Sequence, residues 1–226
     1  MHIKKTNIWA WDEKHTHLYF KEFHKIDGST WSKNNSTWNM LRGRFDNSDR
    51  DSQRSKLYLA EDIMGEYDCD TAEAMTWDEL VEKIAEVINN TWFRRKFGKL
   101  FCDTDLQIHT GHTRQNMAYA LGTDEMSFPP NFRNLPIILH ELTHIIMARL
   151  EWVVAFRKPY NVHGRMFSFI YLELVKKFVG KKEYDLLKKS YKEHGVKYQK
   201  RRMLTSSQKK VLRERFIKSV RKEESK

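Results

Sequence analysis

Cysteine is scarce in this sequence. The 226 residues include only Cys69 and Cys102. Two thiols cannot form a disulfide framework, and they cannot build a zinc ribbon, which takes four cysteines. We therefore expect reduced thiols and a fold held together by a hydrophobic core. Hydrophobic residues make up 40% of the chain, enough for one domain of moderate size with appendages.

Long apolar runs are also missing. No stretch approaches the roughly 20 residues that cross a bilayer. Residues 1–23 mix lysine, histidine and tryptophan and contain no apolar signal core. The sequence therefore predicts a cytoplasmic protein without a membrane partner.

Acidic residues are few near the C-terminus. Residues 176–226 contain 19 Lys and Arg against 6 Asp and Glu, a net charge of +13, whereas the whole chain carries +11. The rest of the chain is therefore close to neutral. Such a cluster predicts contact with the phosphate backbone of a nucleic acid, and a solvated tail is the alternative. The candidate contacts are Lys197, Lys200, Arg201, Arg202, Lys209 and Lys210.

Residues 136–150 contain the motif around which the chain is organised. His140, Glu141 and His144 form His-Glu-x-x-His, and a helix puts the two imidazoles on one face, as zinc requires. The Glu141 carboxylate can then reach a metal-bound water and act as general base. Asn134 is the expected N-cap, and the apolar flanking residues predict a buried helix. Buried histidines and a carboxylate need partners, and a metal is the simplest one. The alternative is a surface helix with paired polar residues.

A catalytic zinc site usually needs a third protein ligand. The metzincin motif would continue with glycine and histidine, but this chain has Met147 and Leu150 at those positions. We favour His163, which precedes an amphipathic helical segment at residues 166–179. Glu173 in that segment is the rival, since it would give a two-His, one-Glu site.

Other local patterns predict the surrounding elements. A capping box, Thr76 to Glu79, opens a strong helix, and helices are also expected at residues 50–62, 91–97 and 183–194. The helix predicted from residue 50 should turn Leu57, Ala60, Ile63 and Met64 inward. Strands are expected at residues 8–11, 17–20, 106–109, 117–121 and 125–128. The last three should form a small antiparallel sheet, whose edge could bind an extended peptide.

Several motifs resemble those of one known family. They are Arg-Asp-x-Gln-Arg at 50–54 with Tyr58, Ala60 and Glu61, Thr-Trp-Phe at 91–93, Ser-Phe-Pro at 127–129, the His-Glu-x-x-His motif, and His-Gly-x-x-Phe at 163–167 followed by Tyr-Leu-Glu-Leu at 171–174. In this order they resemble a family of predicted metallohydrolases of actinobacteria and their phages. His-Glu-x-x-His followed by His-Gly-x-x-Phe also looks like the catalytic core of SprT-like and Spartan proteases, minimal zincins that act on DNA-bound proteins. The resemblance spans roughly residues 50–180. It implies zinc on His140, His144 and His163 with Glu141 as base, and gives the 50–54 motif no role.

One departure limits what the resemblance implies. SprT-like proteins often continue with a cysteine zinc ribbon, which this chain cannot build, so repair of DNA–protein crosslinks is not implied. If the chain is phage-encoded, its expected location is the host cytoplasm.

Together these features predict an α+β, zincin-like fold. We expect an arm at residues 1–48, a metallohydrolase domain at 49–180 and a basic helical tail at 181–226. The expected activity is zinc-dependent peptide hydrolysis, with Tyr119, Tyr160 or His112 as candidate oxyanion stabilisers. The alternative is a nucleic-acid-binding or virion-associated protein whose zinc is structural.

Overall fold

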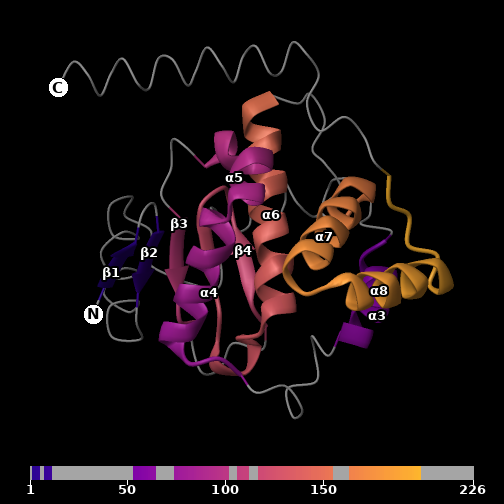
Figure 1. Ribbon diagram of the computed structural model, residues 1–226, viewed down its shortest axis with the longest axis horizontal. Helices are drawn as coiled ribbons and strands as arrows, with labels where there is room; N and C mark the ends of the chain where they lie inside the picture. The colour runs from indigo at the N-terminus through magenta and orange to yellow at the C-terminus, as the bar shows by residue number, and fades with distance from the viewer. Residues whose placement is uncertain are drawn as a thin grey trace, which may run out of the picture.

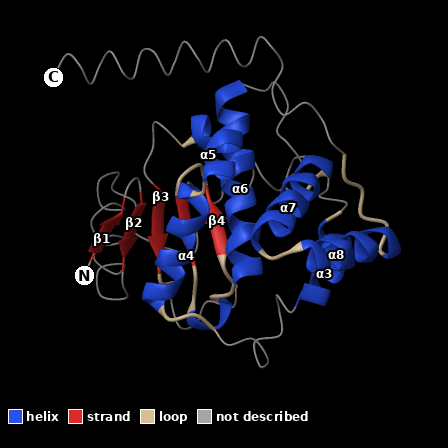
Figure 2. Ribbon diagram, in the orientation of Figure 1, coloured by secondary structure: helices blue, strands red, loops and turns tan. Residues whose placement is uncertain are grey.

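The computed structural model describes residues 2–5, 8–11, 53–64, 74–101, 106–111, 117–154 and 163–199. Its fold is α+β, as predicted, with a mixed sheet on one side of a long helix and further helices on the other (Figures 1 and 2). The predicted strand at residues 17–20 lies outside the described residues.

The sheet contains β1 (His2–Lys5), β2 (Ile8–Trp11), β3 (Leu106–His109), β4 (Tyr119–Leu121) and β5 (Glu125–Ser127), in the order β1-β2-β3-β5-β4. The pairs β1–β2 and β4–β5 are antiparallel, whereas β2–β3 and β3–β5 are parallel. The prediction of a small antiparallel sheet was therefore wrong. A tight turn at Gly122, whose φ of 61° suits glycine, reverses the chain so that β5 inserts between β3 and β4.

The helices are α3 (Arg54–Glu61), α4 (Trp77–Asn89), α5 (Thr91–Phe97), α6 (Leu135–Val154), α7 (Arg165–Phe178) and α8 (Lys181–Glu193), with 3₁₀ turns η1 (Asp62–Met64), η2 (Gly98–Leu100) and η3 (Pro130–Phe132). Two predicted caps are confirmed. Thr76 and Glu79 form the complete capping box of α4, and the Asn134 side chain accepts a hydrogen bond from the Ile137 N–H at 2.9 Å. Each cap satisfies backbone donors that a helix leaves without partners.

The long helix α6 joins the two sides of the molecule. It packs against β4 and β5 on one side and against α7 on the other, while α8 packs on α7 and α3 packs on α8. Its apolar residues Ile138, Leu142 and Ile145 are fully buried, as predicted for this helix. His140 on the same helix is 4% exposed, so its side chain also lies inside the protein.

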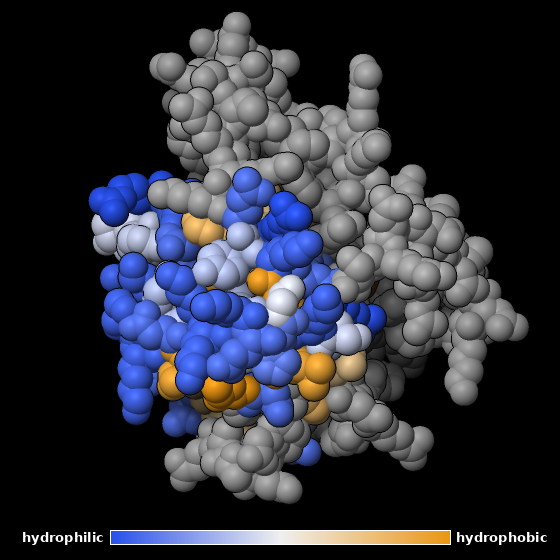
Figure 3. All heavy atoms as spheres, turned by 90° about the vertical axis from the view of Figure 1, so that its right-hand side faces the viewer, coloured by the Kyte–Doolittle hydropathy of each residue, from blue (hydrophilic) through white to orange (hydrophobic). Residues whose placement is uncertain are grey.

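The helices α3 and α8 pack together at the molecular surface. Leu57 and Ala60 of α3 are buried as predicted, but Ile63 was wrongly placed on the inner side, since 52% of its surface is exposed. The chain tightens into η1 at Asp62, which turns Ile63 away from the helical stripe, whereas Met64 packs against the core and is partly buried. The face that carries α3 and α8 is largely hydrophilic (Figure 3). None of the described helices is long and apolar enough to cross a membrane.

Candidate metal centre

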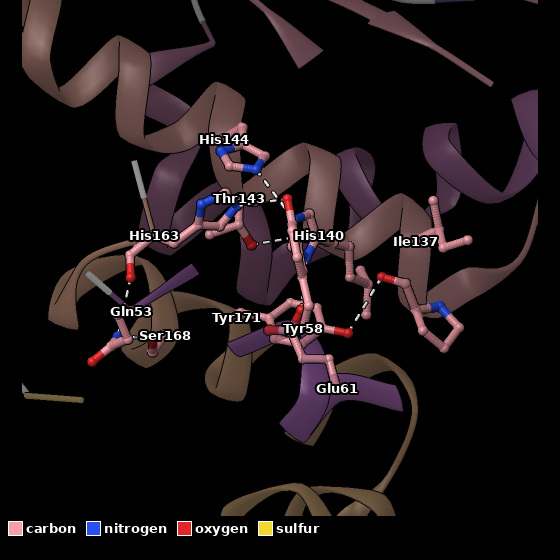
Figure 4. Close-up of polar contacts among 12 residues, drawn as sticks. Gln53, Tyr58, Glu61, Ile137, His140, Thr143, His144, His163, Ser168 and Tyr171 are labelled. Carbon is pink, nitrogen blue, oxygen red and sulfur yellow. Dashed lines mark hydrogen bonds and ion pairs between the residues drawn. The ribbon is translucent and has the colours of Figure 1, made fainter. Parts of the chain in front are cut away.

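His140 and His144 lie one turn apart on α6, on the side that faces α7 and α3 (Figure 4). Their Nε2 atoms are 3.2 Å apart. Two nitrogens bound at about 2.05 Å to a tetrahedral zinc would be roughly 3.3 Å apart. The two imidazoles are therefore already at the spacing that a shared metal requires.

His163 joins this pair from another segment. It lies at the turn that precedes α7, is 4% exposed, and has a ring nitrogen within 4.8 Å of ring nitrogens of both other histidines. These are the three histidines that the sequence predicted as ligands. Among the residues that the structure describes, they form the one group of three or more His, Cys, Asp or Glu side chains close enough to hold a metal ion.

The Phe167 ring packs against the rings of all three histidines. Its ring centroid lies 4.9 Å from that of His140, 4.6 Å from that of His144 and 5.0 Å from that of His163. Because Phe167 lies in the first turn of α7, directly after the turn that carries His163, the start of this helix brings the phenylalanine ring and the third histidine together.

His144 is suited to be a ligand because its surroundings keep it uncharged. Burial lowers the pKa of His144 well below its ordinary value, and His163, His140 and Arg54 lower it further. A neutral imidazole keeps a lone pair on one ring nitrogen, and that lone pair is what a metal binds. The donor set of the site therefore fits a zinc ion.

The first turns of α3 contribute a tyrosine to the site. The Tyr58 hydroxyl lies 3.3 Å from Nε2 of His163, and its ring centroid lies 5.8 Å from that of His140. Burial raises the pKa of this hydroxyl above its ordinary value, although Arg54, whose guanidinium lies over the ring at 5.4 Å, opposes the rise. Tyr58 therefore stays protonated at neutral pH and can donate a hydrogen bond.

Gln53 fixes the loop that carries the third histidine. Its side-chain amide donates to the carbonyl oxygen of His163 and to Oγ of Ser168, both at 3.0 Å. Its carbonyl oxygen accepts from the backbone N–H of Lys197 at 2.8 Å. One glutamine thus links the start of α3, the His163 turn and the segment that follows α8.

Glu141 is buried beside a cavity of about 240 Å³. His140 and Tyr58 line the same cavity, and its remaining walls are apolar: Met117, Ala118, Phe132 and Ile137. The cavity therefore combines a carboxylate and a phenol near the metal ligands with room for an apolar side chain.

No known protein family, curated protein or solved structure matches this chain. Function must therefore be inferred from the chain's own side chains.

The rival third ligand is engaged elsewhere. Glu173 is 29% exposed and pairs with Nζ of Lys96 at 2.6 Å, and it does not belong to the histidine group. On α7, Phe167 and Tyr171 face the site. The ring centroid of Tyr171 lies 5.8 Å from that of His140. Glu173 lies two positions beyond Tyr171, so it projects away from this face.

The predicted oxyanion stabilisers are not brought to the cavity within the described residues. Tyr119 is not among the residues that line it and lies beside Glu125 and Ser127 on β5. Tyr160 and His112 lie outside the described residues, as do Lys200, Arg201, Arg202, Lys209 and Lys210. Lys197 lines a separate surface groove at the end of α8.

No role was predicted for Gln53, Tyr58 or Glu61, yet all three contact the grouped histidines or the loop that holds one. A signal for one of them was present. Glu61 stands four residues after Leu57 and next to Ala60, so it falls on the buried stripe of its own helix. A carboxylate on a buried stripe indicates a buried cationic, metal-linked or hydrogen-bonding partner.

Proposed function

We propose that this chain is a zinc metallopeptidase with a zincin-like site. The observation that supports it best is the group of three histidines, His140, His144 and His163, next to a cavity lined by Glu141. Three imidazoles with a carboxylate that is not a ligand are typical of catalytic zinc sites, which keep a fourth position open. A structural site is usually closed by four protein ligands instead.

A zinc ion on these three imidazoles would supply a Lewis acid and lower the pKa of a water molecule beside it. Glu141 would take the proton of the attacking water and pass it to the leaving amine. Tyr58 would donate its hydroxyl proton in a hydrogen bond to the carbonyl oxygen as negative charge develops there. Tyr58 is preferred to Tyr119 in this role because it lines the cavity with Glu141 and Tyr119 does not.

The proposed substrate is an extended peptide with an apolar side chain beside the scissile bond. β4 is the last strand in the order of the described sheet and packs against α6. A peptide could therefore pair with its outer edge by strand addition. Met117 and Ala118, which directly precede β4, line the cavity, so a side chain of such a peptide would enter an apolar space.

The test is hydrolysis of a diverse peptide library by the zinc-loaded protein, with Glu141→Gln as the matched variant. The amide cannot accept the proton, so turnover should fall by about 10²-fold or more while zinc content is unchanged. Cleavage sites should be enriched in apolar residues on one side. A wild-type protein that holds zinc but cleaves no peptide, or a variant that cleaves as fast as wild type, would contradict the proposal.

One observation favours the second candidate, a nucleic-acid-binding protein. The groove at the end of α8 has a volume of about 610 Å³ and is lined by Lys188, Lys189, Lys192 and Lys197 together with Tyr191 and Tyr198. Lysines beside a partly exposed tyrosine ring suit a phosphate backbone and a stacked base. Such binding is compatible with peptide hydrolysis near nucleic acid. It would stand alone if the zinc proved to be structural.

A further inference from the structure

Glu61 is a carboxylate with no access to solvent. It is the last residue of α3, and each of its carboxylate oxygens has a partner. Oε2 lies 2.9 Å from Nδ1 of His140, and Oε1 accepts a hydrogen bond from the Tyr191 hydroxyl at 2.8 Å. A buried carboxylate is costly unless its oxygens accept hydrogen bonds, so these contacts are what allow it to remain here.

The contact with Glu61 determines which nitrogen of His140 can bind a metal. A carboxylate can only accept, so Nδ1 of His140 must carry the proton in this contact. In a neutral ring the lone pair is then on Nε2, the atom that lies 3.2 Å from Nε2 of His144. The negative charge behind the ring also raises the basicity of Nε2.

The helix α8 in turn fixes Glu61. Tyr191 and its neighbour Ser190 both reach α3, since Oγ of Ser190 donates to the carbonyl oxygen of Ala60 at 2.9 Å. Tyr191 is itself fully buried and is 130 positions from Glu61 in sequence. A metal ligand on α6 is therefore oriented by α3, which is oriented by α8.

We propose that Glu61 is a positioning residue for the metal ligand His140 and that Tyr191 holds Glu61 in place. The inference rests on the proposed zinc site, and it adds that zinc affinity depends on two residues that are not ligands. It also links the last two residues of the Arg-Asp-x-Gln-Arg motif to the site, because Gln53 and Arg54 begin α3, the helix that carries the orienting carboxylate.

The experiment measures Zn²⁺ affinity of the full chain by chelator competition. Glu61→Gln keeps the shape and a hydrogen-bond acceptor but removes the charge, and it should weaken zinc binding about 10- to 100-fold. Tyr191→Phe removes a single hydroxyl and should weaken it in the same direction by a smaller factor. The controls are Glu173→Gln, whose carboxylate pairs with Lys96, and Tyr184→Phe on the same helix as Tyr191, and both should bind zinc like wild type. Circular dichroism establishes that each variant is folded.

A second readout separates orientation from general stability. ¹⁵N NMR of the metal-free wild type should show His140 as the Nδ1–H tautomer, and Glu61→Leu should release it to a mixture. Wild-type affinity in folded Glu61→Gln, or an Nε2–H tautomer in the wild type, would overturn the inference. Because neither readout uses turnover, a chain that binds zinc as expected but hydrolyses no peptide refutes the proposed activity and leaves the role of Glu61 intact. Failure of the wild type to bind zinc refutes both.

Discussion

At the scale of single residues, the three histidines differ in how firmly they are held. His140 and His144 are fixed by the same helix, whereas His163 belongs to a turn that Gln53 and Phe167 hold in place. His140 is further oriented by Glu61. Loss of His140 or His144 should therefore break the pair that α6 preforms, whereas loss of His163 should leave that pair intact.

The ligand prediction follows from this difference. His140→Ala and His144→Ala should each abolish tight zinc binding, and His163→Ala should weaken it strongly, by roughly two orders of magnitude or more. Metal analysis of the purified variants after dialysis tests this. Glu173→Ala is the matched control, because its carboxylate pairs with Lys96 outside the site, and it should retain zinc. Loss of zinc from Glu173→Ala together with retention in His163→Ala would reverse the assignment of the third ligand.

The grouping of the three histidines could be predicted from the sequence, but the residues around them could not. The spacing of His140 and His144 on one helix is a local property, and His163 precedes a recognisable helix. The contacts that Glu61 makes with Tyr191 and that Gln53 makes with Lys197 join positions 130 and 144 residues apart. No periodicity within a segment reports such contacts, because they depend on how α3 packs against α8.

At the scale of elements, the pairing of the strands also could not be predicted from the sequence. The sequence predicted where β2, β3, β4 and β5 lie, because each is a short apolar run bounded by turn residues. It did not predict that β3 pairs with β5 and β2 in parallel. The pairing of strands that are far apart in the chain depends on their packing in the folded protein, and not on the residues of each strand alone.

Two titratable groups, the buried His109 and the largely buried Glu125, lie on the neighbouring strands β3 and β5. Nε2 of His109 and Oε1 of Glu125 are 3.7 Å apart. Burial lowers the pKa of His109 to about 4, and burial with a contribution from Asp124 raises the pKa of Glu125 to about 7. The distance alone would suggest an ion pair, but both shifts favour the uncharged forms. We therefore treat the two as a neutral pair between these pH values.

The two shifts act on stability in opposite directions. Glu125 stabilises the fold below its ordinary pKa of 4.5, and this contribution is lost as the pH rises to about 7. His109 stabilises the fold above its ordinary pKa of 6.5, and this contribution is lost as the pH falls to about 4. In the wild type, the two contributions to stability change in opposite directions between about pH 4.5 and 6.5, so they should largely cancel there.

Replacing one of the two residues should reveal how the other makes folding stability depend on pH. Glu125→Gln should gain stability as the pH rises from about 4 to about 6.5, and His109→Gln should lose stability from about 4.5 to about 7. Each change should be roughly 3 kcal/mol. Urea unfolding at half-unit pH steps measures it. If the profiles of both variants run parallel to that of the wild type, the pair does not titrate as described.

At the scale of the whole molecule, positive charge is concentrated in the last part of the chain. Residues 200–226 contain 11 Lys and Arg against 3 Asp and Glu. They follow directly on Lys197 and Tyr198, which line the lysine-rich groove at the end of α8. All proposed metal ligands, and the residues Glu61 and Tyr191 that position one of them, precede this segment. Zinc binding and nucleic-acid binding should therefore be separable by substitutions after residue 199.

The last prediction uses this separation. Replacement of Lys200, Arg201 and Arg202 by Gln in the full chain should leave zinc content unchanged and weaken binding to random DNA and RNA. Binding by counterion release falls with salt, and three fewer phosphate contacts should reduce the log–log salt slope by up to about three. The matched control replaces the exposed Lys56, Arg94 and Arg95 of α3 and α5, which removes the same charge outside the tail. Fluorescence anisotropy at two salt concentrations measures both.

Equal losses in the two triple variants would mean that net charge alone is responsible, and an unchanged affinity in the tail variant would remove these residues from the nucleic-acid interface. A selective loss with little preference among sequences would instead assign the tail to contacts with the phosphate backbone, because lysine and arginine side chains at a phosphate read charge and not bases.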